Sequence, residues 1–189
     1  MRVGVGLLVI VALLACAAVP RAAAPAATAG SAGRLPEFTH AADADWINSR
    51  PLSSAGLRGR PVLVEVWTFD CSNCLASLPW MQRIAARYAS QGLAIVAVHT
   101  PELPHERDRA ELRRAVARLA IPYPVMVDED YSYWRALGNR YWPAFYLYDG
   151  EGRQVAARVG ELHAGEAGAD NFERQIASAL AAGPPRGMR

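Results

Sequence analysis

Two cysteines separated by two residues, Cys71 and Cys74, have the type and spacing best suited to chemistry in this chain. A thiolate is a nucleophile, and two cysteines about one helical turn apart can close a disulfide. The unpaired amide groups and the positive dipole end of a helix N-terminus favour a thiolate there. We therefore expect Cys71 to be the nucleophile, and Cys74 to be the more buried, resolving partner.

The sequence around the two cysteines predicts the elements that such a pair requires. Residues 62–69 are an apolar, β-branched run typical of a buried strand, and residues 75–88 carry apolar side chains at helical spacing. A structural zinc site would need two further ligands at short spacing. The four histidines show no such spacing: His40, His99, His105 and His163. We expect a redox pair at the start of a helix, without a metal or another cofactor.

Length and charge limit the other classes of function. The 189 residues are enough for one domain with a sizeable core, and the net charge is +2. All twenty basic residues are arginines, and charges of both signs are mixed along the chain. This pattern does not predict a nucleic-acid-binding surface.

Residues 1–24 predict an export signal or an anchor. Met1-Arg2 gives a positive start, and Val3 to Ala18 is apolar but short for a transmembrane span. Cys16 ends a stretch that resembles a lipobox, so lipidation of Cys16, ordinary cleavage after residues 22–24 and an uncleaved anchor all stay open. Each outcome places the domain outside the cytoplasm, in the bacterial periplasm or cell envelope.

The rest of the chain predicts an α/β domain. Residues 25–43 are rich in alanine, proline and glycine and predict a flexible tether; residues 44–183 form the domain, and residues 184–189 a disordered tail. Strands are expected at 93–99, 123–128, 144–148 and 153–159, and helices at 106–119, 131–137 and 172–182. This order indicates a sheet with both parallel and antiparallel strands.

The pattern resembles the thioredoxin fold, and within it the extracytoplasmic thiol-disulfide oxidoreductases of the TlpA, ResA and DsbE type. It is similar above all to the thioredoxin-like domain of DipZ-type cytochrome c biogenesis proteins. Six stretches carry the resemblance: residues 46–49, 66–68, 71–74, 78–79, 98–102 and 138–143. The resemblance implies a mixed central sheet flanked by helices, with an inserted helix-strand segment before a cis-proline.

The resemblance implies that Pro143 is this cis-proline and faces the cysteine pair. A proline has no amide hydrogen, which leaves neighbouring backbone groups free to pair with an extended substrate. Trp142 precedes it, and Ser72 and Asn73 lie between the cysteines. We expect these three residues to line a substrate groove.

Two carboxylates lie near the cysteines in sequence. Glu65 stands close to where thioredoxins carry a buried aspartate that handles the proton of the resolving cysteine. An acid in an apolar strand predicts a raised pKa, which suits an acid-base role toward Cys74. The alternative is a Glu65 that tilts to the surface and pairs with an arginine. Asp70 replaces the aromatic residue of thioredoxin, and a carboxylate beside Cys71 favours a less oxidising pair.

The expected function is that of an extracytoplasmic thiol-disulfide oxidoreductase, a reductase of protein disulfides, with cytochrome c maturation as one setting. The substrates are protein disulfides or thiols, and the electrons are expected from a membrane-embedded donor. The membrane is expected to be contacted only through the N-terminus, if at all, and no nucleic acid is expected to bind. Two alternatives stay open: a disulfide-forming oxidase, and a Sco-like copper carrier that uses both cysteines with His99 or His163.

Overall fold

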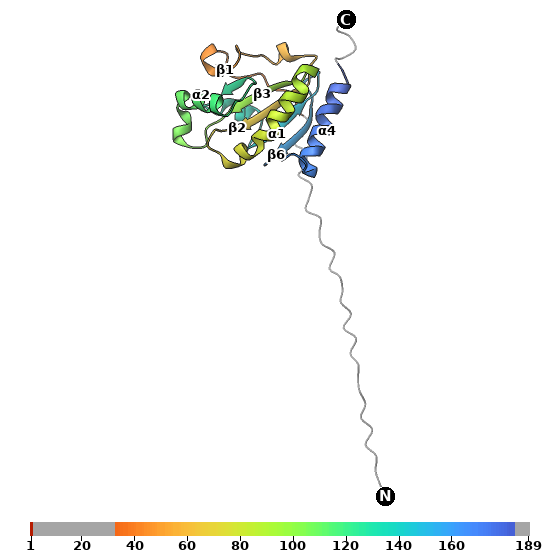
Figure 1. Ribbon diagram of the computed structural model, residues 1–189. Helices are drawn as coiled ribbons and strands as arrows, with labels where there is room; N and C mark the ends of the chain where they lie inside the picture. The colour runs from red at the N-terminus through yellow and green to blue at the C-terminus, as the bar shows by residue number, and fades with distance from the viewer. Residues whose placement is uncertain (2–32, 184–189) are drawn as a thin grey trace.

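The computed structural model describes residues 33–183, together with Met1 (Figure 1). The predicted export signal or anchor, Cys16, the first part of the tether and the C-terminal tail lie outside the described residues. Within the described part of the chain, the longest and most apolar helices fall short of what is needed to cross a membrane.

A six-stranded mixed sheet forms the centre of the domain. Its strands are β1 (Trp46–Ile47), β2 (Val62–Trp67), β3 (Ala94–His99), β4 (Val125–Val127), β5 (Ala144–Tyr148) and β6 (Gln154–Val159). Their order in the sheet is β1-β4-β3-β2-β5-β6. Strands β2, β3 and β4 are parallel, whereas β1, β5 and β6 are antiparallel to their neighbours. The predicted α/β architecture with a mixed sheet is confirmed.

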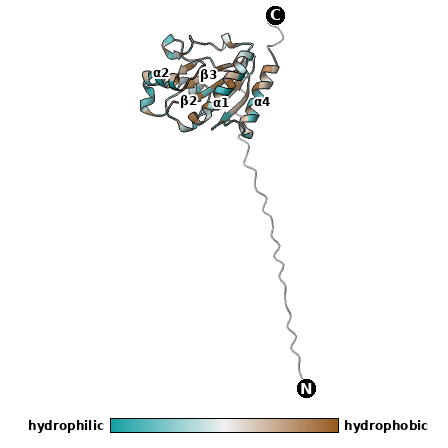
Figure 2. Ribbon diagram, in the orientation of Figure 1, coloured by the Kyte–Doolittle hydropathy of each residue, from teal (hydrophilic) through white to brown (hydrophobic). Residues whose placement is uncertain are grey.

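Helices cover both faces of this sheet (Figures 1 and 2). They are α1 (Ser72–Tyr88), α2 (Arg109–Arg118), α3 (Ser132–Ala136) and α4 (Ala167–Ala181). Helices α1, α2 and α4 contribute buried side chains to one apolar cluster. Helix α3 and the segment before β1 contribute to the cluster on the other face. The core is therefore divided by the sheet into two layers.

The central strand β2 carries the chain to the two cysteines. All six of its residues are buried, between β3 on one side and β5 on the other. Leu63 and Trp67 belong to the cluster beneath α1, and Val64 belongs to the opposite cluster. Because side chains alternate along a strand, Glu65 faces the same layer as Leu63 and Trp67. Strand β2 therefore places one acidic side chain in the layer that also contains Cys74.

Several elements begin at positions other than those predicted. Helix α2 starts at Arg109 rather than at residue 106, because the Asp108 carboxylate caps it by accepting the Ala110 and Glu111 amides at 2.8 and 3.1 Å. Residues Pro104–Arg107 form a separate 3-10 turn. Strand β4 is shorter than predicted, and the two prolines just before it lack the amide hydrogens that a ladder needs. Helix α4 starts five residues earlier, at Ala167.

Residues 33–43, which the sequence assigns to the tether, are packed on the domain. Phe38 is 5% exposed and stacks on Tyr133 with ring centroids 5.1 Å apart. It also meets the Trp46 ring edge-on at 5.5 Å. Burying one such side chain stabilises a fold by about 1.5–3 kcal/mol. The predicted boundary at residue 44 is therefore too late, since an isolated aromatic in a polar segment anchors that segment to the core.

Candidate active site

Cys71 lies at the N-cap of α1, directly after the loop that leaves β2. Its backbone is extended, and its Sγ accepts the Cys74 amide hydrogen at a donor–acceptor distance of 3.4 Å. The side chain is partly exposed, and both cysteines are free thiols. A helix N-terminus presents amide hydrogens to a sulfur atom in this position, which favours its negatively charged form. The geometry suits Cys71 for attack on an incoming disulfide.

Cys74 is in a different environment one helical turn away. It is 3% exposed and packs in the apolar cluster beneath α1. Burial raises the pKa of the Cys74 thiol, and the hydrogen bond with Cys71 and the charge of Glu65 raise that pKa further. One cysteine is therefore accessible, whereas the other is held as a buried thiol.

Glu65 is buried beneath the cysteines, with 3% of its surface exposed. Burial raises the pKa of its carboxyl group to about 8, against a smaller lowering by a hydrogen bond from Tyr123. The Tyr123 hydroxyl donates that bond to Oε2 at 3.3 Å. The structure therefore places Glu65 in the interior with a tyrosine partner, and the surface-tilted, arginine-paired alternative is wrong. Nothing in the sequence pointed to Tyr123, which lies 58 positions further along the chain.

The Trp142–Pro143 peptide bond is cis, and Pro143 is buried immediately before β5. Ala144 pairs with Val66 in the antiparallel ladder between β5 and β2. Because Val66 is one residue from the end of β2, Pro143 lies at the end of the sheet from which the cysteine loop leaves. Ser72 and Asn73 are exposed on the first turn of α1. A groove made by Trp142, Ser72 and Asn73 stays a prediction.

Trp142 is held by contacts to two other loops. Its indole Nε1 donates to the Thr100 carbonyl oxygen at 2.9 Å, and its ring meets the Trp134 ring with centroids 4.2 Å apart. Thr100 follows β3 directly, and its hydroxyl donates to Asp128 at 3.0 Å. The residue before Pro143 is therefore connected, through Thr100, to a buried carboxylate.

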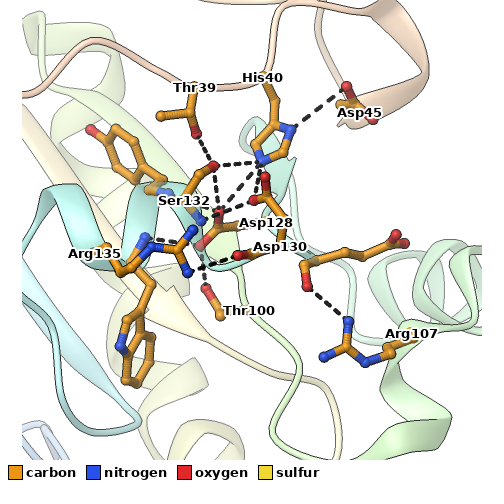
Figure 3. A network of polar contacts seen from close by, with 12 residues as sticks. Thr39, His40, Asp45, Thr100, Arg107, Asp128, Asp130, Ser132 and Arg135 are labelled. Atoms are coloured by element: carbon orange, nitrogen blue, oxygen red, sulfur yellow. Dashed lines mark hydrogen bonds and ion pairs between the residues drawn. The ribbon is translucent and has the colours of Figure 1, made fainter.

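That carboxylate, Asp128, is the centre of the network in Figure 3. It is fully buried and accepts the Tyr133 and Trp134 amide hydrogens at 2.9 Å each, which caps the start of α3. His40 approaches it from the N-terminal segment, with Nε2 3.4 Å from Oδ1. Sequence reasoning missed this role, although an aspartate between a strand and a short helix is a recognisable capping signal. The network joins the N-terminal segment, the loop after β3 and α3.

His40, Asp128 and Asp130 form the one group in residues 33–183 whose ligand atoms are close enough together to hold a metal ion. It contains neither cysteine. His99 is buried and contacts the Thr68 hydroxyl at 3.1 Å, and His163 contacts Glu161 at 2.6 Å. The histidines that a copper carrier would use are thus engaged with other side chains. The Asp128 carboxylate already accepts hydrogen bonds from the Thr100 hydroxyl and from two amides at the start of α3.

Asp70, the residue before Cys71, has an exposed side chain. Its carboxylate lies 3.0 Å from His105 Nε2, and that histidine is exposed as well. Exposed ion pairs of this kind contribute little to stability. The backbone amide of Asp70, unlike its side chain, points to a buried group: it donates to the Glu106 carboxylate at 3.1 Å. Sequence reasoning placed Glu106 on a helix face and gave it no role.

Comparison with known proteins relates this site to a family. The Redoxin family profile matches residues 28–172. Protein DipZ of Mycobacterium bovis is 36% identical over 119 residues, which cover 61% of this chain but 17% of DipZ. Thiol-disulfide oxidoreductase YkuV of Bacillus subtilis is 27% identical over 147 residues, covering 78% of this chain and 94% of YkuV.

The fold is also similar to those of solved structures. A putative thiol:disulfide interchange protein DsbE from Chlorobium tepidum superposes with a TM-score of 0.64. The two chains are 23% identical, and the superposition covers 79% of this chain and 96% of the other. This likeness confirms the predicted thioredoxin-like fold.

Proposed function

We propose a reaction and a cellular setting for this protein, which belongs to the Redoxin family and is a thiol-disulfide oxidoreductase of the thioredoxin type. The reaction begins when the Cys71 thiolate attacks one sulfur of a substrate disulfide. A mixed disulfide forms, and the other substrate sulfur leaves as a thiolate that takes up a proton. Cys74 then attacks the Cys71 sulfur, and the second substrate sulfur leaves. The substrate gains two electrons and two protons, and the enzyme is left with a Cys71–Cys74 disulfide.

The observation that carries this assignment is the asymmetry of the two cysteines. Cys71 is partly exposed at the N-cap of α1, whereas Cys74 is 3% exposed. Glu65 is near enough to Cys74 to influence the pKa of its thiol. A buried thiol must lose its proton before it can act as a nucleophile. We assign that proton to Glu65, whose pKa of about 8 allows it to exchange protons near neutral pH. Tyr123 holds the carboxylate in place.

The direction we assign is reduction of protein disulfides. Strong oxidants of this fold type have a reduced form that is stabilised by a low-pKa thiolate. Here burial acts against a thiolate at Cys74. The reduced pair therefore lacks that stabilisation at one of its two sulfurs, which favours giving electrons to a substrate.

The setting we assign is extracytoplasmic, with electrons from a membrane-embedded donor. The support is the positive start and apolar run of residues 1–18, which are typical of an export signal or anchor. Cytochrome c maturation is one such setting. The intact mass of the protein recovered from a bacterial envelope fraction tests this part. Recovery of the protein only from the cytoplasm, with residues 1–24 intact, would contradict export.

The equilibrium reduction potential of the Cys71/Cys74 pair tests the direction. We expect a value near that of thioredoxin, about −270 mV. It can be measured by titration in thiol-disulfide buffers with tryptophan fluorescence, since Trp67 packs in the same cluster as Cys74. A Cys71→Ser variant, which cannot form the disulfide, is the control for unspecific fluorescence changes. A potential near −120 mV, that of a strong oxidant, would overturn the assignment as a reductase.

A further inference from the structure

Glu106 is a buried acid that the reaction described above does not use. Glu106 is 2% exposed and lies in the 3-10 turn Pro104–Arg107. One carboxylate oxygen, Oε1, accepts the Asp70 amide hydrogen at 3.1 Å. The other, Oε2, accepts the Glu102 and Leu103 amide hydrogens at 2.7 Å each. The Thr68 hydroxyl donates to the same carboxylate.

These four donors keep Glu106 ionised inside the protein. Burial by itself raises the pKa of the carboxyl group, but the hydrogen bonds from Thr68, Leu103, Asp70 and Glu102 outweigh it and hold the pKa below its ordinary value. An ionised carboxylate can only accept hydrogen bonds, so all four partners must donate. A buried negative charge with a full set of donors is a well-defined anchor point.

The network continues from Thr68 to His99 behind the loop. The Thr68 hydroxyl also lies within hydrogen-bond distance of His99, 3.1 Å from Nε2. Burial lowers the pKa of His99 to about 4, against a smaller raising effect of Glu106, which keeps the ring neutral near pH 7. Its ring stacks on Phe69, with centroids 5.4 Å apart.

The partners of Glu106 extend beyond those of a helix cap. Capping its own 3-10 turn accounts for the Leu103 and Glu102 amides, which lie three and four positions before it. Thr68 and Asp70 instead belong to the loop between β2 and α1, and Asp70 is 36 positions away in sequence. Asp70 immediately precedes Cys71. The carboxylate thus fixes the backbone of the residue next to the reacting sulfur.

We propose that Glu106 is a positioning residue for the thiol-disulfide reaction: it acts through the backbone of Asp70 and the hydroxyl of Thr68 to hold Cys71 at the N-cap of α1. This rests on the proposed role of Cys71 as the attacking residue. Without the Glu106 carboxylate, β2 keeps its pairing in the sheet, but the loop after Trp67 loses the hydrogen bonds that fix Thr68 and Asp70. Cys71 then leaves the geometry in which its sulfur accepts the Cys74 amide hydrogen.

Glu106→Gln, compared with Glu102→Gln, tests this proposal. Glutamine replaces one acceptor oxygen by an NH₂ group, so at least one of the four donors loses its partner. We expect the rate constant for attack on an aromatic disulfide probe to fall at least tenfold. The amide of Asp70 should exchange its hydrogen at least tenfold faster, while amides of β2 and β3 keep their protection. Glu102 carries the same charge in the same loop with an exposed side chain, and its variant should stay within twofold of the wild type.

The reduction potential is the readout that a purely structural role of Glu106 would not move. Moving Cys71 away from the N-cap geometry removes the Cys74 amide from its sulfur and so disfavours the thiolate of the reduced pair. We expect the equilibrium constant with glutathione to shift about tenfold toward the oxidised form, which is about 30 mV toward more negative values. A Glu106→Gln variant that matches Glu102→Gln in rate and in potential would overturn the proposal.

If Glu106→Gln does not fold, Thr68→Val and Thr68→Ser decide the question. Valine removes one donor to Glu106 and serine keeps it. Attack should slow at least threefold with valine and stay within twofold of the wild type with serine; equal rates in both variants would overturn the proposal. A wild-type protein without attack, or a Cys71→Ser variant that still attacks the probe, would instead refute the proposed function.

Discussion

Replacing Cys71 with serine should slow the reduction of disulfides roughly a thousandfold or more, because a hydroxyl group is a far weaker nucleophile than a thiolate near neutral pH. The loss should appear in the first step, the attack on an aromatic disulfide probe that releases a coloured thiol. The replaced group is partly exposed at the start of α1, so the fold should be preserved. Stopped-flow absorbance gives the rate constant, and circular dichroism checks the fold.

Cys74→Ser is the matched control for this prediction. It changes the same type of side chain one turn further along α1, but it leaves the attacking sulfur in place. We expect the first attack to persist and repeated turnover to be lost. If Cys71→Ser attacks the probe within tenfold of the wild-type rate, Cys71 is not the nucleophile.

The free energy of unfolding should fall as the pH rises from about 4.5 to about 8, owing to Glu65. In the folded protein burial raises the pKa of Glu65 to about 8, whereas the unfolded chain releases this proton near 4.5. Between these values the folded state binds the extra proton, so stability decreases with pH. The slope is about 1.4 kcal/mol per pH unit at its steepest, and the total is on the order of 5 kcal/mol. Below about pH 4.5 both states are protonated, and the full contribution is present.

Glu65→Gln isolates this contribution, because glutamine has nearly the same shape and does not titrate. Urea unfolding of both proteins at a series of pH values gives the difference in stability. We expect the variant to gain on the wild type steadily as the pH increases through this window. Parallel stability curves for the two proteins would show that Glu65 does not hold a proton in the folded state.

The sequence was sufficient to predict the residues whose role depends on local context. Cys71 and Cys74 follow a buried strand and open a helix, so their placement could be read from a short stretch of sequence. Glu65 lies in the middle of an apolar strand, and its burial follows from the neighbours on both sides. The presence of β3, β5 and α1 could be predicted from the runs and the spacing of their apolar residues.

The rest could not be predicted, because it depends on hydrogen bonds between segments far apart in sequence. Tyr123 meets Glu65, and Glu106 meets Asp70, only once β2, β3 and β4 lie side by side. Phe38 stood alone in a polar segment, and its partner Tyr133 comes almost a hundred residues later. Such pairs leave no periodic pattern in the sequence, so the contacts between their residues could not be predicted.

Trapping of the mixed disulfide in the Cys74→Ser variant tests the central claim most directly. The variant is mixed with insulin, whose disulfides serve as a protein substrate, and the products are separated without reductant. We predict a stable covalent adduct, and peptide mapping by mass spectrometry should locate its disulfide at Cys71. No adduct with Cys74→Ser, or an adduct that forms at Cys74 in the Cys71→Ser variant at a comparable rate, would contradict the assignment of Cys71 as nucleophile and Cys74 as resolving cysteine.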